Sequence, residues 1–270
     1  MKILRLCVTA VFVVVLVLFG VFQLRQLKTD KTLPTITVSE QTLKVSLDVT
    51  TEELLAGVTA YDKKDGDLTQ KIIVESISRF VEPGVSIVKY VVCDSDNHVA
   101  SATRRIEYTN YVPPRFQLSD SLVFNISQNI SIRNILGAVD AIDGDISNKI
   151  IITSNEYTAN IPGVYYISAK VTNSKGDMAT QLLPVYVEEQ SLSAPKIELR
   201  QYITYLKAGE RFDIYDNVLS AVASNGEDLS SAVSVDTNLN YAVPGTYEVH
   251  YRVSDSENRT GHKIAIIIVE

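Results

Sequence analysis

Clustered aspartates are the residues of this 270-residue chain whose types and spacing come closest to a chemical site. Two clusters share one spacing: Asp62, Asp65 and Asp67, then Asp140, Asp143 and Asp145. Their carboxylates could supply the hard oxygen ligands that Ca²⁺ prefers. The alternative is a tight turn, in which the intervening glycine takes a positive φ and the aspartates accept backbone hydrogen bonds. No Glu stands at the twelfth position of an EF-hand loop, so we predict turns, with no metal-binding or cofactor-binding residues and calcium as the alternative.

The other chemistry-bearing residues are scattered. His98, His250 and His262 show no His-x-x-x-His spacing, and we predict that they are solvated surface residues. The chain lacks Gly-x-Ser-x-Gly, His-Glu-x-x-His and a glycine-rich phosphate loop. Carboxylate pairs are frequent, but a glycosidase acid needs a pocket that raises its pKa, and domains of this size offer little room for one. We therefore predict no catalytic residues and no enzymatic activity.

The aspartates recur because the sequence repeats. A Pro-Gly pair, followed by an alternating segment and an Asx-rich turn, begins at Pro83, Pro162 and Pro244. The glycines of these pairs lie 79 and 82 positions apart. Self-similarity at a nearly fixed period indicates tandem copies of one small domain.

Each copy consists of short, alternating segments rich in β-branched residues. The predicted inward positions are Val88, Tyr90 and Val92 in the first copy, and Tyr247, Val249, Tyr251 and Val253 in the third. Turn signals about every ten residues predict an all-β sandwich for each copy. Pro184 falls in a predicted final strand, and because proline cannot donate to a ladder it predicts an edge strand there.

An apolar run of seventeen residues, Leu6 to Phe22, precedes the repeats. As a helix it would cover roughly 25 Å, close to the ~30 Å hydrocarbon core of a bilayer. We predict one N-terminal transmembrane helix, an uncleaved signal anchor, with a cleaved signal peptide as the alternative. The predicted organisation is residues 1–33 as anchor and juxtamembrane segment, followed by domains at 34–110, 111–190 and 191–270.

Charge and cysteine content narrow the class of protein. Residues 1–33 sum to +4, so the remainder of a chain with net charge −7 carries −11. An acidic domain region disfavours nucleic acid, which binds by phosphate neutralisation. Of the two cysteines, Cys7 lies in the apolar run and Cys93 stands alone, so no intradomain disulfide can form. An extracellular β protein without disulfides indicates a bacterial source, and we predict a Gram-positive one.

The strings GVTAYDKKDGDLTQKIIV and PGVSIVKYVVCDSDNHVA resemble the bacterial immunoglobulin-like domains of Gram-positive surface proteins, a type also found in a pesticidal crystal protein. The second copy matches the pattern with AVDAIDGDISNKI and PGVYYISAKV. The third keeps PGTYEVHYRVSDSEN but has ASNGEDLSSAV in place of the acidic motif. The resemblance covers residues 34–270 and implies three tandem Ig-like β-sandwiches with no catalytic residues.

These observations predict a non-enzymatic, single-pass membrane protein whose C-terminal domains are extracellular and act as an adhesive or spacer stalk. A carbohydrate-binding surface module and a structural component of an envelope assembly are the alternatives. The predicted partners are the membrane, through the N-terminal helix, and a protein or glycan ligand. The chain has no Trp. The tyrosines that the predicted cores do not account for, and that we expect to be exposed contact residues, are Tyr108, Tyr111, Tyr202 and Tyr205.

Overall fold

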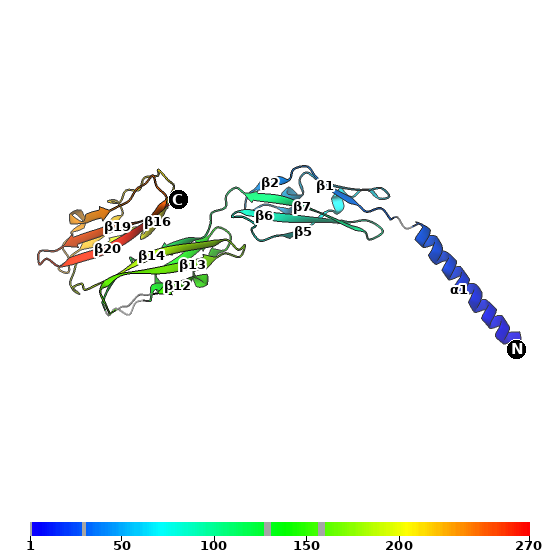
Figure 1. Ribbon diagram of the computed structural model, residues 1–270, viewed down its shortest axis with the longest axis horizontal. Helices are drawn as coiled ribbons and strands as arrows, with labels where there is room; N and C mark the ends of the chain where they lie inside the picture. The colour runs from blue at the N-terminus through cyan, green and yellow to red at the C-terminus, as the bar shows by residue number, and fades with distance from the viewer. Residues whose placement is uncertain (1, 29–30, 127–130, 156–159) are drawn as a thin grey trace. The chain divides into compact units, whose positions relative to one another are not determined.

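A computed structural model describes residues 2–28, 31–126, 131–155 and 160–270. The described chain is mostly β-strand with few helices, as the sequence predicts (Figure 1). It divides into two compact units, Met1–Asn110 and Tyr111–Glu270. The first repeat copy lies in the first unit, and the second and third copies lie together in the second.

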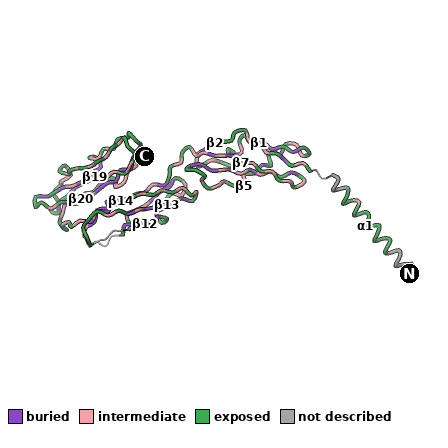
Figure 2. The backbone as a smooth tube through the Cα atoms, in the orientation of Figure 1, coloured by how far each residue is buried: buried purple, intermediate pink, exposed green. Residues whose placement is uncertain are grey.

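Helix α1 (Lys2–Lys28) forms over the apolar run. Residues 8–23 are exposed except for Gly20, which is intermediate (Figure 2). No helix among the described residues combines the length and the apolar character needed to cross a membrane. The predicted transmembrane helix is therefore not supported.

The first copy folds as two sheets around one core. Its strands are β1 (Thr35–Val38), β2 (Thr42–Val45), β3 (Val58–Asp62), β4 (Gly66–Asp67), β5 (Ile73–Ile77), β6 (Val85–Cys93) and β7 (Val99–Tyr108). One sheet has the strand order β1-β3-β4 and the other β2-β7-β6-β5. A 3₁₀ turn, η1 (Thr69–Lys71), follows β4. The short helix α2 (Thr51–Leu55), which the sequence analysis did not predict, begins at a capping box formed by Thr50 and Glu53.

The core of the first copy contains the residues that alternation placed there. Val88, Tyr90 and Val92 on β6 are almost completely buried, which confirms their predicted inward face. The Tyr90 hydroxyl donates a 2.7 Å hydrogen bond to the carbonyl oxygen of Leu54. This bond ties helix α2 to the sheet, and burial raises the pKa of the Tyr90 phenol. The phenol therefore stays protonated at neutral pH and remains a donor.

Replacing Tyr90 with phenylalanine is expected to destabilise the first unit by about 1 kcal/mol, because the variant loses this hydrogen bond inside the core. Hydrogen exchange of the β6 amides in the full chain measures the effect within the first unit. Tyr61→Phe is the matched control, since its side chain is 60% exposed. An equal loss of protection in both variants would contradict the structural role of the Tyr90 hydroxyl.

The second unit begins with the second copy. Its strands are β8 (Arg115–Leu118), β9 (Val123–Asn125), β10 (Leu136–Asp140), β11 (Gly144–Asp145), β12 (Ile151–Asn155), β13 (Gly163–Thr172) and β14 (Met178–Glu188). The 3₁₀ turns η2 (Ile132–Asn134) and η3 (Ser147–Lys149) stand before β10 and after β11. The strand orders are β11-β10-β8 and β12-β13-β14-β9.

The third copy repeats this plan. Its strands are β15 (Lys196–Leu199), β16 (Ile203–Leu206), β17 (Val218–Val222), β18 (Ser234–Thr237), β19 (Gly245–Ser254) and β20 (Thr260–Val269). The 3₁₀ turn η4 (Ser230–Ala232) precedes β18. One sheet pairs β15 with β17, and the other has the order β16-β20-β19-β18.

In all three copies a short early strand pairs in parallel with the last strand. These pairs are β2 with β7, β9 with β14, and β16 with β20. Strand β14 is therefore not an edge strand, and the prediction made from Pro184 is wrong. The reason is that β9 pairs only with Tyr186, Val187 and Glu188, so it stops short of Pro184 and leaves the proline without a partner on that side.

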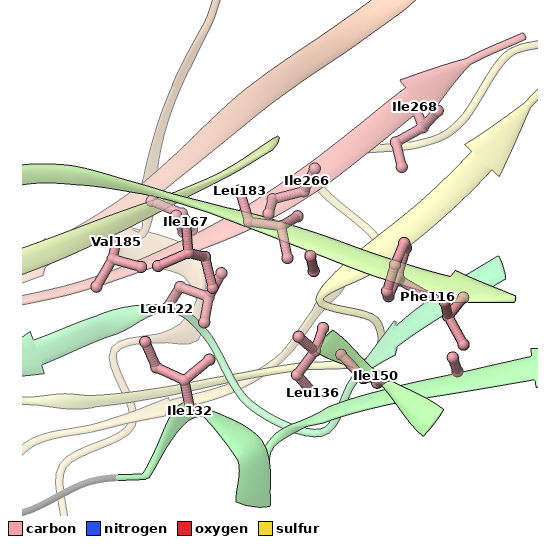
Figure 3. Close-up of a cluster of buried hydrophobic side chains, with 14 of the residues drawn as sticks. Phe116, Leu122, Ile132, Leu136, Ile150, Ile167, Leu183, Val185, Ile266 and Ile268 are labelled. Atoms are coloured by element: carbon pink, nitrogen blue, oxygen red, sulfur yellow. The ribbon is translucent and has the colours of Figure 1, made fainter. Parts of the chain in front are cut away.

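The second and third copies share one hydrophobic cluster. On β20, Ala265, Ile267 and Val269 belong to the core of the third copy. The alternate residues Ile264, Ile266 and Ile268 pack with residues of the second copy such as Phe116 and Leu122. Figure 3 shows Ile266 and Ile268 in this cluster. Strand β20 is thus buried on both faces, which explains why its sequence is almost continuously apolar.

Candidate functional site

The aspartate clusters form turns held by backbone hydrogen bonds. The Asp62 carboxylate accepts from the backbone N–H groups of Lys64 and Asp65 at 2.8 and 3.0 Å. In the second copy, the Asp140 carboxylate accepts hydrogen bonds from the backbone N–H groups of Ile142 and Asp143, both at 2.9 Å. The glycines Gly66 and Gly144 take φ values of +77° and +69°, as the turn prediction requires.

The middle aspartate of each cluster fastens the turn to the next hairpin. Both oxygens of Asp65 accept from Ser95, one from its backbone N–H and one from its hydroxyl, each at 2.7 Å. Asp143 holds Ser174 in the same way at 2.7 and 2.6 Å. The hydrogen bonds from Ser95 lower the pKa of Asp65. Within the described ranges, no group of three or more His, Cys, Asp and Glu residues has an arrangement that could hold a metal ion.

His250 and His262 lie next to each other between the second and third copies, although the sequence predicts that both are solvated surface residues. His262 is only 5% exposed, and its ring stacks on that of His250 with centroids 5.3 Å apart. Nδ1 of His250 lies 3.1 Å from Nε2 of His262. The prediction of solvated histidines is wrong for this pair because the outer face of β19 and β20 is covered by the second copy. His98 has a local role, with Nδ1 2.8 Å from the Asp94 carboxylate in a turn.

Carboxylates of both copies complete this histidine cluster. Glu188 on β14 lies 2.8 Å from Nδ1 of His262, and Tyr186 on the same strand donates a 2.6 Å hydrogen bond to Glu248 on β19. Burial raises the pKa of Glu188, but the hydrogen bonds from His262 and Gln190 outweigh it, so the pKa lies below its ordinary value. A hydrogen bond from His250 likewise lowers the pKa of Glu248.

Acidification is expected to destabilise the second unit through these two carboxylates. Because their folded-state pKa values are lowered, they stabilise the fold above about pH 4.3, and the contribution is lost as pH falls through the lowered values. Thermal unfolding of the full chain at pH 7 and pH 3 measures the loss. Glu188→Gln is expected to show a smaller drop than the unchanged chain. The exposed neighbour Glu189→Gln is the control, and equal drops in both variants would count against the cluster.

A groove of about 890 Å³ lies between the second and third copies, and we call it the inter-copy groove. Strands β8 and β10 of the second copy and residues 200–206 and 210–212 of the third provide its walls. Four arginines line it: Arg115, Arg133, Arg200 and Arg211. Four aromatic residues line it as well: Phe116, Tyr202, Tyr205 and Phe212. A cationic, aromatic groove is unexpected in a chain of net charge −7.

Tyr205 on β16 joins the two walls of the inter-copy groove. Its hydroxyl accepts a 2.8 Å hydrogen bond from the backbone N–H of Phe116, and the Arg115 guanidinium lies 4.7 Å above its ring. Burial raises the pKa of Tyr205 to about 12, so the hydroxyl is neutral under ordinary conditions. Arg115 also pairs with Glu270 at 2.5 Å.

The four tyrosines expected to be exposed are all half-buried. Tyr202 and Tyr205 line the groove, whereas Tyr108 packs on the first core beside Phe80. The Tyr111 hydroxyl donates to Asp177 and accepts from Asn173. The four groove arginines lie far apart along the chain, and no motif in the sequence connects them. The apolar outer face of β20 was the signal that could have revealed the packing that gathers them.

Comparisons with known proteins agree with the fold. Residues 201–269 match the family model described as bacterial surface protein, Ig-like domain. The chain is 34% identical over 126 residues to the pesticidal crystal protein Cry22Aa of Bacillus thuringiensis, covering 45% of this chain and 16% of that protein. It is 27% identical over 189 residues to an uncharacterized 81.3 kDa protein of Acholeplasma phage L2, covering 66% of this chain and 25% of that protein. The chain thus spans a quarter or less of the length of these curated relatives.

Solved structures that match the chain come from a bacterium and from mouse. A Clostridium perfringens ZmpB structure of CBM51-2 in complex with GlcNAc and INT domains matches at 21% identity and a TM-score of 0.24, covering 54% of this chain and 26% of that chain. Mouse cadherin-23 EC22-24 matches at 13% identity and a TM-score of 0.20, covering 89% of this chain and 99% of that chain. The family model that matches residues 201–269 describes the type of domain that the repeat motifs of the chain resemble.

Proposed function

We propose that the chain is a non-enzymatic bacterial surface module that adheres to a ligand through its second and third copies. The inter-copy groove carries this proposal, because it brings arginine and aromatic side chains of two copies to one place. Surface exposure is supported by the bacterial surface protein Ig-like domain of the third copy. Membrane attachment through residues 6–22 is not part of the proposal.

The behaviour of the aspartates supports a non-catalytic role. A general acid needs a pKa near the working pH, which requires a group that is hard to ionise. Hydrogen bonds from Ser95 instead lower the pKa of Asp65, and Lys149 and Ser174 lower the pKa of Asp143. These carboxylates are therefore ionised turn residues that hold backbone amides.

A passive spacer is the second candidate, favoured by the tandem repetition of one fold. A spacer needs stable domains, but it has no use for four arginines and four aromatic residues gathered in one groove. Adhesion accounts for both the repetition and the groove.

The two functions differ in a retention experiment. The full chain, immobilised on beads, is incubated with a panel of surface polymers that includes acidic and neutral glycans and matrix proteins. Adhesion predicts saturable retention of at least one polymer, above beads without protein, and no release of cleaved product. Retention of none would establish the spacer, and release of product would overturn the non-enzymatic assignment.

A further inference from the structure

We infer that the inter-copy groove binds an acidic oligosaccharide whose sugar rings carry carboxylate groups. This inference rests on the proposed adhesive function and adds the chemical class of the ligand. The observations that carry it are the charge of the groove, its aromatic surfaces and the state of the neighbouring strand edge.

The charge of the groove favours an anionic ligand. Glu210 is the one acidic residue among the described lining residues, against four arginines. The Glu210 carboxylate accepts a hydrogen bond from the backbone N–H of Lys207, so it is used within its own turn. Guanidinium groups bind carboxylates through paired hydrogen bonds, which makes arginine the residue suited to this class of ligand.

The arginines differ in how far the protein already neutralises them. Arg115 is paired with Glu270, whereas Nε of Arg200 lies 3.9 Å from the Asp216 carboxylate and donates a 2.8 Å hydrogen bond to the backbone carbonyl of Asp216. Arg211 lies over the ring of Tyr241, and Arg133 makes a 3.4 Å hydrogen bond to a backbone carbonyl. In the part of the chain that the structure describes, no carboxylate pairs with Arg133 or Arg211. Both side chains are exposed, so their charge is available to a ligand.

The aromatic residues favour sugar rings. Tyr202, Tyr205 and Phe212 line the groove beside the arginines with half-buried aromatic surfaces, and the Arg115 guanidinium lies over the ring of Tyr205. The C–H groups of a pyranose ring pack on such surfaces, while the polar edge of the ring faces hydrogen-bonding groups. A sugar ring that carries a carboxylate can pack its ring on the aromatic residues and pair its carboxylate with the guanidinium groups of the groove.

The strand edge beside the groove argues against an extended peptide. A peptide strand would bind by pairing with an open backbone edge. β8 is the last strand of its sheet, but the N–H of Phe116 already donates to the Tyr205 hydroxyl. The edge is therefore used in joining the two copies, and the side chains of the groove remain as its recognition surface.

Isothermal titration of the full chain at low salt tests the inference with three matched probes. Tetragalacturonic acid has sugar rings and carboxylates, its methyl ester has the same rings without charge, and tetraglutamate has charge without rings. The acid is expected to bind about tenfold or more tightly than either other probe. The double variant Arg133→Gln/Arg211→Gln is expected to lose about tenfold in affinity for the acid, since two bidentate partners are removed. Arg79→Gln, an exposed site in the first copy, is the control and should bind unchanged.

Each outcome decides the inference. Equal binding of the methyl ester would overturn the role of charge, and equal binding of tetraglutamate would point to an acidic peptide. Unchanged affinity in the double variant would place any site outside the groove. If the acid does not bind but the beads retain another polymer, the ligand class is wrong and adhesion stands. If neither experiment shows binding, both proposals fail.

Discussion

Ile266→Ala is expected to lower the free energy of unfolding of the second unit by about 2–5 kcal/mol, the usual cost of truncating a fully buried isoleucine. Ile266 is 0% exposed although it lies on the outer face of its own copy. Its side chain packs in the cluster of the second copy (Figure 3), so the cavity weakens the contact between the copies as well as the strand that bears it. Urea unfolding of the full chain, followed by circular dichroism, measures the change.

The matched control for this prediction is Ile151→Ala in the same unit. The Ile151 side chain is 58% exposed, so its truncation should change stability much less. If the third copy folded without contact to the second, the outer face of β20 would be exposed to water. Ile266→Ala would then lower the free energy of unfolding about as little as Ile151→Ala does. Equal effects of the two variants would therefore refute the shared core.

The second large effect is expected at Gly261. A Cβ atom added there would lie 2.0 Å from the carbonyl oxygen of Pro195 and 3.0 Å from its carbonyl carbon. The obstacle is backbone, so no side-chain rotation can relieve it, and β20 or the segment before β15 must shift. Gly261→Ala is expected to destabilise the second unit by about 1–3 kcal/mol or more. Thermal unfolding of the full chain measures the loss.

Gly245→Ala provides the comparison for Gly261→Ala. Gly245 lies on the neighbouring strand β19, and its added Cβ would make only an ordinary 3.4 Å contact with the ring of Tyr247. Neither glycine has a positive φ, so both variants carry the same backbone change and differ in crowding. A Gly261→Ala variant as stable as Gly245→Ala would show that the close approach to Pro195 is easily relieved.

The local features of the fold could be predicted from the sequence because each depends on neighbouring residues. Alternation placed Tyr90 and Tyr251 inside, and both are fully buried. The Asp-Gly-Asp motif predicted a turn with positive φ at Gly66 and Gly144, which the structure has. Such signals arise from strand geometry and glycine conformation, and they do not require knowledge of distant parts of the chain.

The candidate site could not be predicted because it depends on packing between copies. Alternation assigns His250 to the outer face of β19 correctly, but it cannot say whether water or another domain covers that face. The groove residues Arg133 and Arg211 are also far apart in sequence and approach only when β20 is covered by the second copy. The almost continuous apolar sequence of β20 was the local indication that both of its faces are covered.

The parallel pairing of early and last strands has a mechanical consequence. When the two ends of a copy are pulled apart, parallel neighbours slide along each other, so the hydrogen bonds between them are loaded together and not one after another. In the first and third copies four residue pairs share this load, whereas β9 and β14 of the second copy provide three. The second copy therefore has the shorter clamp, and the cluster that β9 shares with Ile264, Ile266 and Ile268 of the third copy adds buried apolar contacts to it.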